Sequence, residues 1–319
     1  MDLLFEKEGT NGSTELKSLL GFIDADIKFD KIKPDVITAT NELVDLVGPE
    51  MYTLARAAYI ANPVSDATLV YHMRYPIAIM AYSLLAPSND IAHTANGRKM
   101  RQDENQKQAF EWMIDRDNQA LQKRYYRAVD DLLKYLETIE AWKTTEAYKA
   151  VKRLFVNNTK DFDEHFRIQS RFTLLQLAPG MRQCEERNIL PRIGRERFDA
   201  LKTAVTTGAT INDADAELIA LIQEACVYHS LAWGMARLSV TIFPDGVLQA
   251  YTSDRETTQI RRPAVNTEVQ AARQAFAADA ASALERIEKL VAPVPVAPPP
   301  GCPGSVLPDV SFGTNYIST

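Results

Sequence analysis

The chain has 319 residues, 46% of them hydrophobic, and a formal net charge of −6. The hydrophobic content excludes an intrinsically disordered chain, and the length suits two domains of ordinary size. The negative net charge argues against tight nucleic-acid binding, which usually needs a basic surface. Three cysteines, with no two close together in the sequence, are typical of reduced thiols in a protein made in the cytoplasm.

No segment has the pattern of a signal peptide or of a membrane span. The N-terminal residues lack a basic region followed by a continuous apolar one. The apolar run YPIAIMAYSLLA at 75–86 is much shorter than the about 20 residues that cross a bilayer. We therefore expect no membrane partner.

The first predicted element is a short helix that follows GTNGST at 9–14. This stretch resembles a phosphate-binding loop but lacks the Lys-Ser/Thr pair of a P-loop. We interpret it as a turn in which Ser13 or Thr14 caps the helix ELKSLLGF.

Two further helices are expected before residue 90. Apolar residues at helical spacing predict one that begins after Pro34 and ends at Gly48, since glycine often follows the last residue of a helix. The apolar stretch 66–86 predicts the other, with Pro76 as a kink or a break.

A β-hairpin and a long helix are expected next. An Asn-Gly pair is typical of a tight turn, so a hairpin is predicted near 90–100. Residues 102–139 have one apolar face, to which Phe110 and Met113 contribute, and predict a helix about 57 Å long. Because one small core cannot cover such a helix, we expect part of it to contact the second half of the chain, a neighbouring subunit, or both.

The second half of the chain repeats this order. Residues 141–170 predict a short basic helix and a polar turn that link the halves. A helix is then expected from near Pro179 to Gly194, followed by an apolar helix at 215–238. The remaining expected elements are a β-hairpin near 239–251 and a helix at 266–291.

A short motif indicates that this repetition is a duplication. The stretch LVGPEMY at 46–52 returns as RIGRERF at 192–198, so that Gly48, Glu50 and Tyr52 match residues 146 positions later. We predict a mainly α fold with two tandem copies of a helical module (helix–Gly–helix, short β-hairpin, long helix). The predicted boundaries are a first module at 1–140, a linking segment at 141–170, a second module at 171–291 and an extended Pro-rich docking tail at 292–319.

No motif of a catalytic, metal or cofactor site is present. The four histidines lie outside any close pair, and the alternating acids after Asp213 lack the glycine of a calcium loop. Carboxylates are abundant, but Lys and Arg surround them, which is typical of solvated helix faces. We expect no enzyme, no cofactor and no bound metal. An α-helical enzyme stays as the less favoured alternative, with Asp161, Asp163, Glu164 and His165 as its central patch.

The sequence resembles the small helical head–tail connector proteins of tailed bacteriophages, also called neck adaptor or head-completion proteins. More closely, it resembles a family of duplicated virion proteins from phages of Bacteroidetes. The matching stretches are LVGPEMY, AFEWMIDRDNQAL, WKTTEAYKAVKRLFVNNTKDFDEHF and ILPRIGRERF, and the resemblance covers about residues 20–250.

This resemblance implies a structural virion protein in the neck or tail region, made in the host cytoplasm. Such proteins form a ring, commonly of twelve subunits, beneath the portal protein, where the ring extends the DNA channel and offers a platform for the tail or further neck proteins. Genomic DNA would pass through the lumen without sequence-specific binding, repelled by acidic residues. A tail-completion or tail-terminator ring is the alternative within the virion.

Interface residues are predicted in two places. Phe243 lies in the second expected hairpin, where an apolar strand edge could pair with another chain, although core packing explains it equally well. The C-terminal tail is the other, because an extended Pro-rich segment suits docking. The tail residues predicted at the interface are Pro298, Pro299, Pro300, Phe312 and Tyr316.

Overall fold

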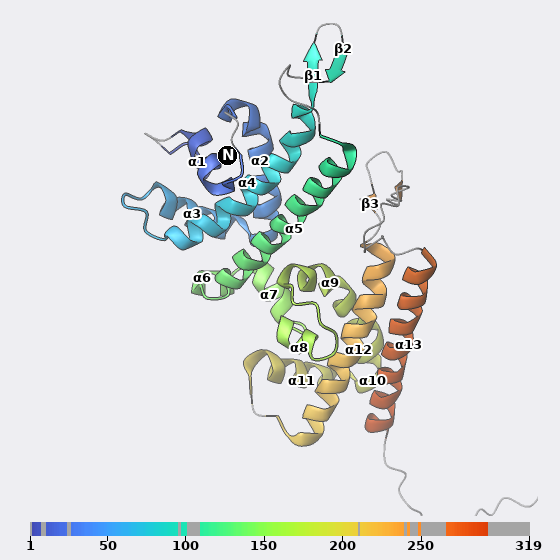
Figure 1. Ribbon diagram of the computed structural model, residues 1–319. Coiled ribbons are helices and arrows are strands. Elements are labelled where there is room, and N and C mark those ends of the chain that lie inside the picture. The colour runs from blue at the N-terminus through green and yellow to red at the C-terminus, as the bar shows by residue number, and fades with distance from the viewer. Residues whose placement is uncertain are drawn as a thin grey trace, which may run out of the picture.

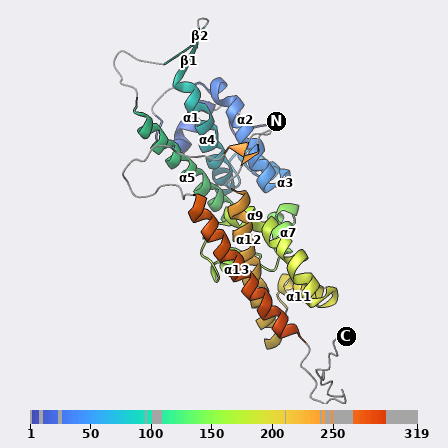
Figure 2. The same ribbon diagram turned by 90° about the vertical axis from the view of Figure 1, so that its right-hand side faces the viewer.

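The computed structural model is mainly α-helical, as predicted, and its helices form two bundles that follow one another along the chain (Figure 1). A view turned by 90° shows an elongated molecule with one bundle beyond the other (Figure 2). The structure describes residues 2–7, 11–23, 27–94, 97–100, 109–209, 211–238, 241–242, 248–249 and 266–292.

The first bundle is built around a central apolar helix. The helices of this bundle are α1 (Gly12–Leu20), α2 (Phe29–Val47), α3 (Pro49–Ile60), α4 (Ala67–Asn89) and α5 (Glu111–Leu136). Helix α4 packs against the other four, and an apolar surface on all sides suits this central place. The Asp66 side chain caps it by accepting a hydrogen bond from the Leu69 amide.

Two short strands follow α4. Strands β1 (Ile91–Thr94) and β2 (Gly97–Met100) pair antiparallel, with Ile91 opposite Met100.

The second bundle is also built around one central helix, α12 (Asp213–Arg237), which packs against α9 (Arg171–Cys184) and α13 (Asn266–Val291). Helix α6 (Glu140–Lys143) follows α5, and its Trp142 is buried in the core of the first bundle. The other elements of the second half are α7 (Glu146–Lys152), α8 (Thr159–Asp163), the π-helix η1 (Glu185–Ile189), α10 (Leu190–Ile193), α11 (Arg195–Thr207), β3 (Thr241–Ile242) and β4 (Leu248–Gln249). Strands β3 and β4 pair antiparallel. An ion pair between Arg286 and Glu224 joins α13 to α12 at 2.9 Å.

The N-terminal segment 2–7 packs onto the first bundle. Phe5 is buried, and the guanidinium of Arg74 lies between the rings of Phe5 and Tyr59. Arg74 also forms a 2.7 Å ion pair with Glu15, which accepts a hydrogen bond from the Tyr59 hydroxyl. One cation therefore ties the N-terminal segment, α1, α3 and α4 together.

The two bundles meet where α5 contacts the start of α9. The Asp130 carboxylate on α5 accepts hydrogen bonds from the Phe172 amide at 2.9 Å and from the Ser170 hydroxyl at 3.1 Å. The Phe172 ring stacks on Tyr126. Asp130 thus caps a helix of the second bundle from a helix of the first.

Gly48 and Gly194 have the same backbone conformation. Their φ and ψ angles are 87° and 150° for Gly48, and 79° and 156° for Gly194, a region that is open almost solely to glycine. The amide of each glycine donates a hydrogen bond to the carbonyl four residues before it. The carbonyl of each glycine accepts one from the amide four residues after it, that of Tyr52 for Gly48 and that of Phe198 for Gly194. Both aromatic side chains are buried.

Prolines are not the helix boundaries that the sequence suggested. Helix α2 begins at Phe29, with Pro34 inside it, and α9 begins at Arg171, with Pro179 inside it. Helix α4 continues through Pro76 without a break. A proline inside a helix costs about 3 kcal/mol, and the burial of residues before it, such as Phe29 in α2, offsets that cost.

The prediction of a 38-residue helix at 102–139 was wrong. Helix α5 begins at Glu111 and has 26 residues, a length of about 39 Å. Residues 101–108 lie outside the described part of the chain. Phe110 precedes the helix as its N-cap and is exposed, so it does not join the buried face.

Two smaller predictions also need correction. Asn11, rather than Ser13 or Thr14, caps α1, because its side chain accepts a hydrogen bond from the Ser13 amide. The linking segment 141–170 contains α7, α8 and most of α6, in place of one basic helix and a turn. Phe155 and Phe162 of this segment are buried in the core of the second bundle.

Candidate functional site

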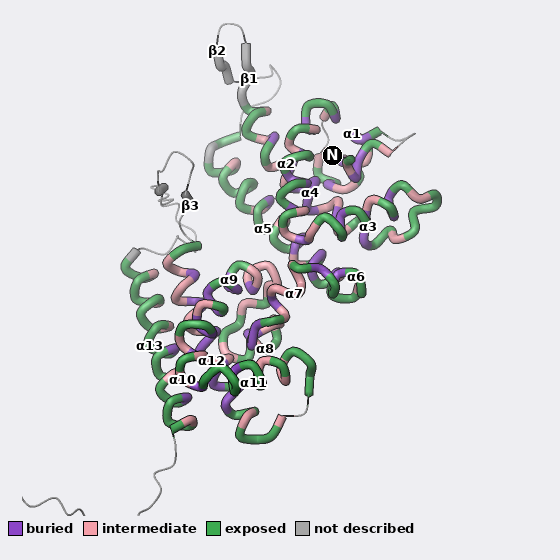
Figure 3. The backbone as a smooth tube through the Cα atoms, turned by 180° about the vertical axis from the view of Figure 1, so that it is seen from behind, coloured by how far each residue is buried: buried purple, intermediate pink, exposed green. Residues whose placement is uncertain are grey.

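The first part of α5 carries a group of exposed apolar side chains. Phe110, Trp112 and Met113 are 67%, 51% and 41% exposed. None of the described side chains between 112 and 120 is buried, and this stretch is largely green in Figure 3. Because exposed aromatic and Met side chains are enriched at protein interfaces, we name Phe110, Trp112 and Met113 the α5 apolar patch.

The second bundle holds a buried ion pair next to its π-helix. The Glu185 carboxylate is fully buried, accepts a 2.6 Å hydrogen bond from the Phe155 amide and lies 2.5 Å from the Lys202 ammonium. Burial raises the pKa of Glu185, whereas Lys202 opposes that rise. The π-helix leads into Pro191, which has no amide hydrogen with which to continue the α-helical ladder.

Two cysteines lie beside this ion pair. Cys184 on α9 and Cys226 on α12 are both free thiols and fully buried. A hydrogen bond to the Cys184 sulfur, which the Cys226 thiol can make only while it keeps its proton, and burial both raise the pKa of the Cys226 thiol. Cys226 is therefore held in the neutral thiol form, which suits packing better than nucleophilic chemistry. Cys302 lies outside the described residues.

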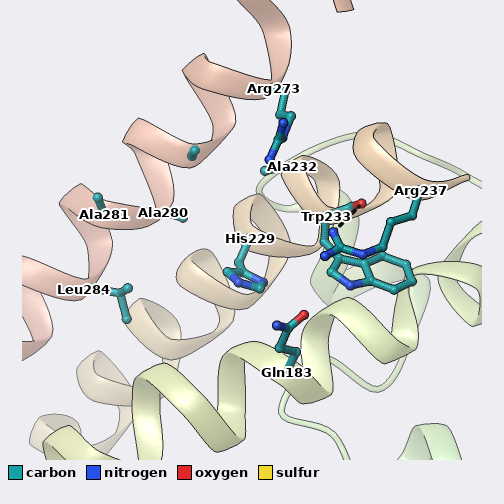
Figure 4. Close-up of a pocket in the computed structure, with 10 residues that line it drawn as sticks. Gln183, His229, Ala232, Trp233, Arg237, Arg273, Ala280, Ala281 and Leu284 are labelled. Carbon is teal, nitrogen blue, oxygen red and sulfur yellow. Dashed lines mark hydrogen bonds between the residues drawn. The ribbon is translucent and has the colours of Figure 1, made fainter. Parts of the chain in front are cut away.

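A groove of about 290 Å³ lies between α9, α12 and α13 (Figure 4). One wall is apolar and comes from α13, with Ala280, Ala281 and Leu284. Helix α12 contributes His229, Trp233 and Arg237 and other residues, α9 contributes Gln183, and Arg273 reaches toward the groove from α13.

Close packing of α9 on α12 forms the floor of this groove. A Cβ atom on Gly180 would lie 3.1 Å from Trp233, and one on Gly234 would lie 2.6 Å from Leu177. The two glycines therefore let the helices approach closely. The Gly180 carbonyl then reaches Nδ1 of His229 at 3.2 Å.

The hydrogen bond to Gly180 sets the tautomer of His229. Because a carbonyl can only accept, Nδ1 carries the hydrogen and Nε2 is left as an acceptor in the neutral ring. Burial lowers the pKa of His229, the hydrogen bond to Gly180 opposes this, and the positive charge of Arg237 lowers the pKa further. His229 is therefore neutral at physiological pH.

The residues predicted from sequence as interface residues lie outside the described part of the chain. They are Phe243, Pro298, Pro299, Pro300, Phe312 and Tyr316.

The acidic patch of the enzyme alternative has structural contacts. Asp161 lies in the first turn of α8, where the Asn158 side chain caps its amide, and burial raises its pKa. Asp163 accepts hydrogen bonds from the Ile168 and Gln169 amides. Within the described residues, no group of three His, Cys, Asp or Glu side chains could hold a metal ion.

Sequence reasoning missed the groove. His229, Trp233 and Arg237 recur every four residues and so share one face of α12, which is the only signal that the sequence offers for it. Gln183 and Arg273 come from distant segments, and no local pattern connects them to that face.

The chain was compared with known proteins. A model described as a family of unknown function (DUF6712) matches residues 19–152 and 190–292, which is well over half of the chain. The chain belongs to this family. The matched segments include Gly48 and Gly194 with the helices that these glycines separate. No curated protein and no solved structure matches the chain. In the described part of the chain, every helix is too short or too polar to span a membrane.

Proposed function

We propose that this protein is a structural virion protein that forms a head-to-tail connector ring beneath the portal of a tailed bacteriophage. The ring would extend the DNA channel and hold the tail or further neck proteins. The role requires no catalysis and no cofactor. The observation that carries the proposal is the α5 apolar patch, because assembly would cover it.

The α5 apolar patch supports self-association for a physical reason. Burial of apolar surface is favourable by about 25 cal/mol per Å², yet Phe110, Trp112 and Met113 leave theirs in water at one end of a helix. Aromatic anchors of this kind often supply most of the binding energy of an interface. A neighbouring subunit of the ring is the partner we propose for the patch.

The proposal includes two tandem copies of one module. Gly48 and Gly194 separate α2 from α3 and α10 from α11, with the same backbone angles and the same pattern of hydrogen bonds. In each half, a central helix (α4 or α12) then packs against a later long helix (α5 or α13). Two modules in one chain would make a taller or wider ring element from one gene.

The resemblance of LVGPEMY and the other stretches to phage connectors supplies the virion context. The net charge of −6 suits a channel through which DNA passes without adhering. The portal protein, the tail or further neck proteins, and other copies of the chain are the proposed partners.

Native mass spectrometry and negative-stain averages, with the protein alone and mixed with its portal, test the proposal. We expect a closed ring on the portal, of about twelve copies as the resemblance to phage connectors implies. A monomer in both samples would refute it. Binding to the tail tube and not to the portal would favour a tail-completion or tail-terminator ring instead.

A pair of variants tests the role of the patch. Trp112→Ser and Met113→Ser together should weaken assembly about tenfold or more, because they remove apolar area from the interface. Ile60→Ser is a matched control, since Ile60 is 54% exposed at the end of α3, outside the patch. Equal assembly of the patch variant and the control would show that the patch is not an interface.

A further inference from the structure

We infer that the groove between α9, α12 and α13 binds a small organic anion with a flat apolar body, such as an aromatic carboxylate. This site does not depend on the proposed ring function. The inference rests on the charge and the shape of the groove.

The positive charge comes from two arginines that have no acidic partner among the described residues. No described carboxylate pairs with Arg237 or Arg273, and none of the described residues that line the groove is Asp or Glu. Other arginines at this end of the chain are paired, for example Arg286 with Glu224 and Arg192 with Glu288. Two neighbouring cations without carboxylates favour an anionic ligand, because a guanidinium binds a carboxylate through charge-assisted hydrogen bonds.

The apolar walls select a ligand with an apolar body. The alanines of α13 and Leu284 line one side of the groove with small apolar side chains, and Trp233 of α12 also lines it. The Arg237 guanidinium lies over that ring, 5.2 Å from its centre, which holds a positive charge beside the apolar side chains of the groove. The volume of about 290 Å³ is close to the lower end of small-molecule sites, which begin at about 300 Å³.

Two polar groups would orient the ligand. The Gln183 amide offers both a donor and an acceptor. His229 keeps Nδ1 on the Gly180 carbonyl, so its Nε2 is free to accept from a hydroxyl or amide of the ligand. An inorganic ion such as phosphate would use the arginines but leave the apolar walls in water.

Isothermal titration calorimetry of the full chain with 2-naphthoate tests the inference. We expect saturable binding of one molecule per chain. The neutral analogue 2-naphthalenemethanol should bind at least about fivefold more weakly, because it lacks the charge that the arginines bind. Inorganic phosphate at the same concentration should not displace the naphthoate.

Variants connect the binding to the groove. Arg273→Gln and Arg237→Gln should each weaken naphthoate binding about fivefold, a modest value because both side chains are exposed. Ala281→Phe fills the groove while both arginines stay, and it should abolish binding. Arg195→Gln is the matched control, an exposed arginine on α11 outside the groove, and it should bind as the unchanged chain does.

Each other result would overturn the inference. Absence of saturable binding would exclude the site, and equal binding of the neutral analogue would exclude the role of charge. Displacement by phosphate would show a simple anion site without apolar recognition. The ligand would have to bind elsewhere if naphthoate binding stayed unchanged in all three groove variants, Arg273→Gln, Arg237→Gln and Ala281→Phe. Circular dichroism would have to show that these variants are folded.

Discussion

Replacing Lys202 with methionine removes the cation that faces the buried Glu185 carboxylate. Glu185 then keeps the Phe155 amide as its partner in a buried site, since its side chain is 0% exposed. Breaking a fully buried ion pair costs about 3–5 kcal/mol. Lys202 is 25% exposed, so we expect a smaller loss in the free energy of unfolding, about 2–3 kcal/mol.

The loss should depend on pH with a defined sign. Burial raises the pKa of Glu185 above its ordinary value of 4.5, and removal of Lys202 raises it further. The folded variant therefore takes up a proton at a higher pH than the unfolded chain does. Its free energy of unfolding should rise, relative to the unchanged chain, as the pH falls from about 8 toward about 5.

Urea unfolding followed by circular dichroism at both pH values measures this effect. Glu185→Gln combined with Lys202→Met should recover most of the stability, because an amide oxygen still accepts from Phe155 and no charge is buried. Lys149→Met is the control: its ion pair with Glu146 is exposed, and its loss should stay below about 0.5 kcal/mol. A Lys202→Met loss no larger than the control's, or one equal at both pH values, would refute the reasoning.

Three further predictions concern the fold. Gly194→Ala should cost about 1–3 kcal/mol in urea unfolding from backbone strain alone, since a Cβ there meets no atom within 4 Å; a cost near zero would contradict the observed φ of 79°. Asp130→Ala should cost about 1 kcal/mol, because the Phe172 amide and the Ser170 hydroxyl at the start of α9 lose their acceptor while Ser170 still caps Thr173. If the bundles meet elsewhere, Asp130→Ala will cost no more than Asp131→Ala, a neighbour on α5. The pKa of His229 is lowered in the folded chain, so the free energy of unfolding should fall as the pH drops below 6.5. His229→Gln should make the free energy of unfolding depend less on pH, which urea midpoints at about pH 5 and 7.5 would show. An unchanged slope would mean that His229 does not titrate differently in the two states.

Long helices with strong local signals were predictable. The expected helices at 66–86, 215–238 and 266–291 correspond to α4, α12 and α13, and both Gly48 and Gly194 end a helix. These features depend on periodicity and on glycine conformations that neighbouring residues already specify. Helix starts near Pro34 and Pro179 were missed because the local cost of proline was outweighed by burial against distant segments.

The sequence by itself determined the helical class, the periodicity of the central helices and the two glycine junctions, because each depends on residues within about one or two turns of one another. Only the tertiary structure decided which distant side chains meet. The contact of Cys184 with Cys226, the Glu185–Lys202 ion pair and the groove between α9, α12 and α13 all join segments that no local pattern connects. Their positions follow from how the helices pack around α12, where burial of apolar surface and close approach at glycines set the geometry.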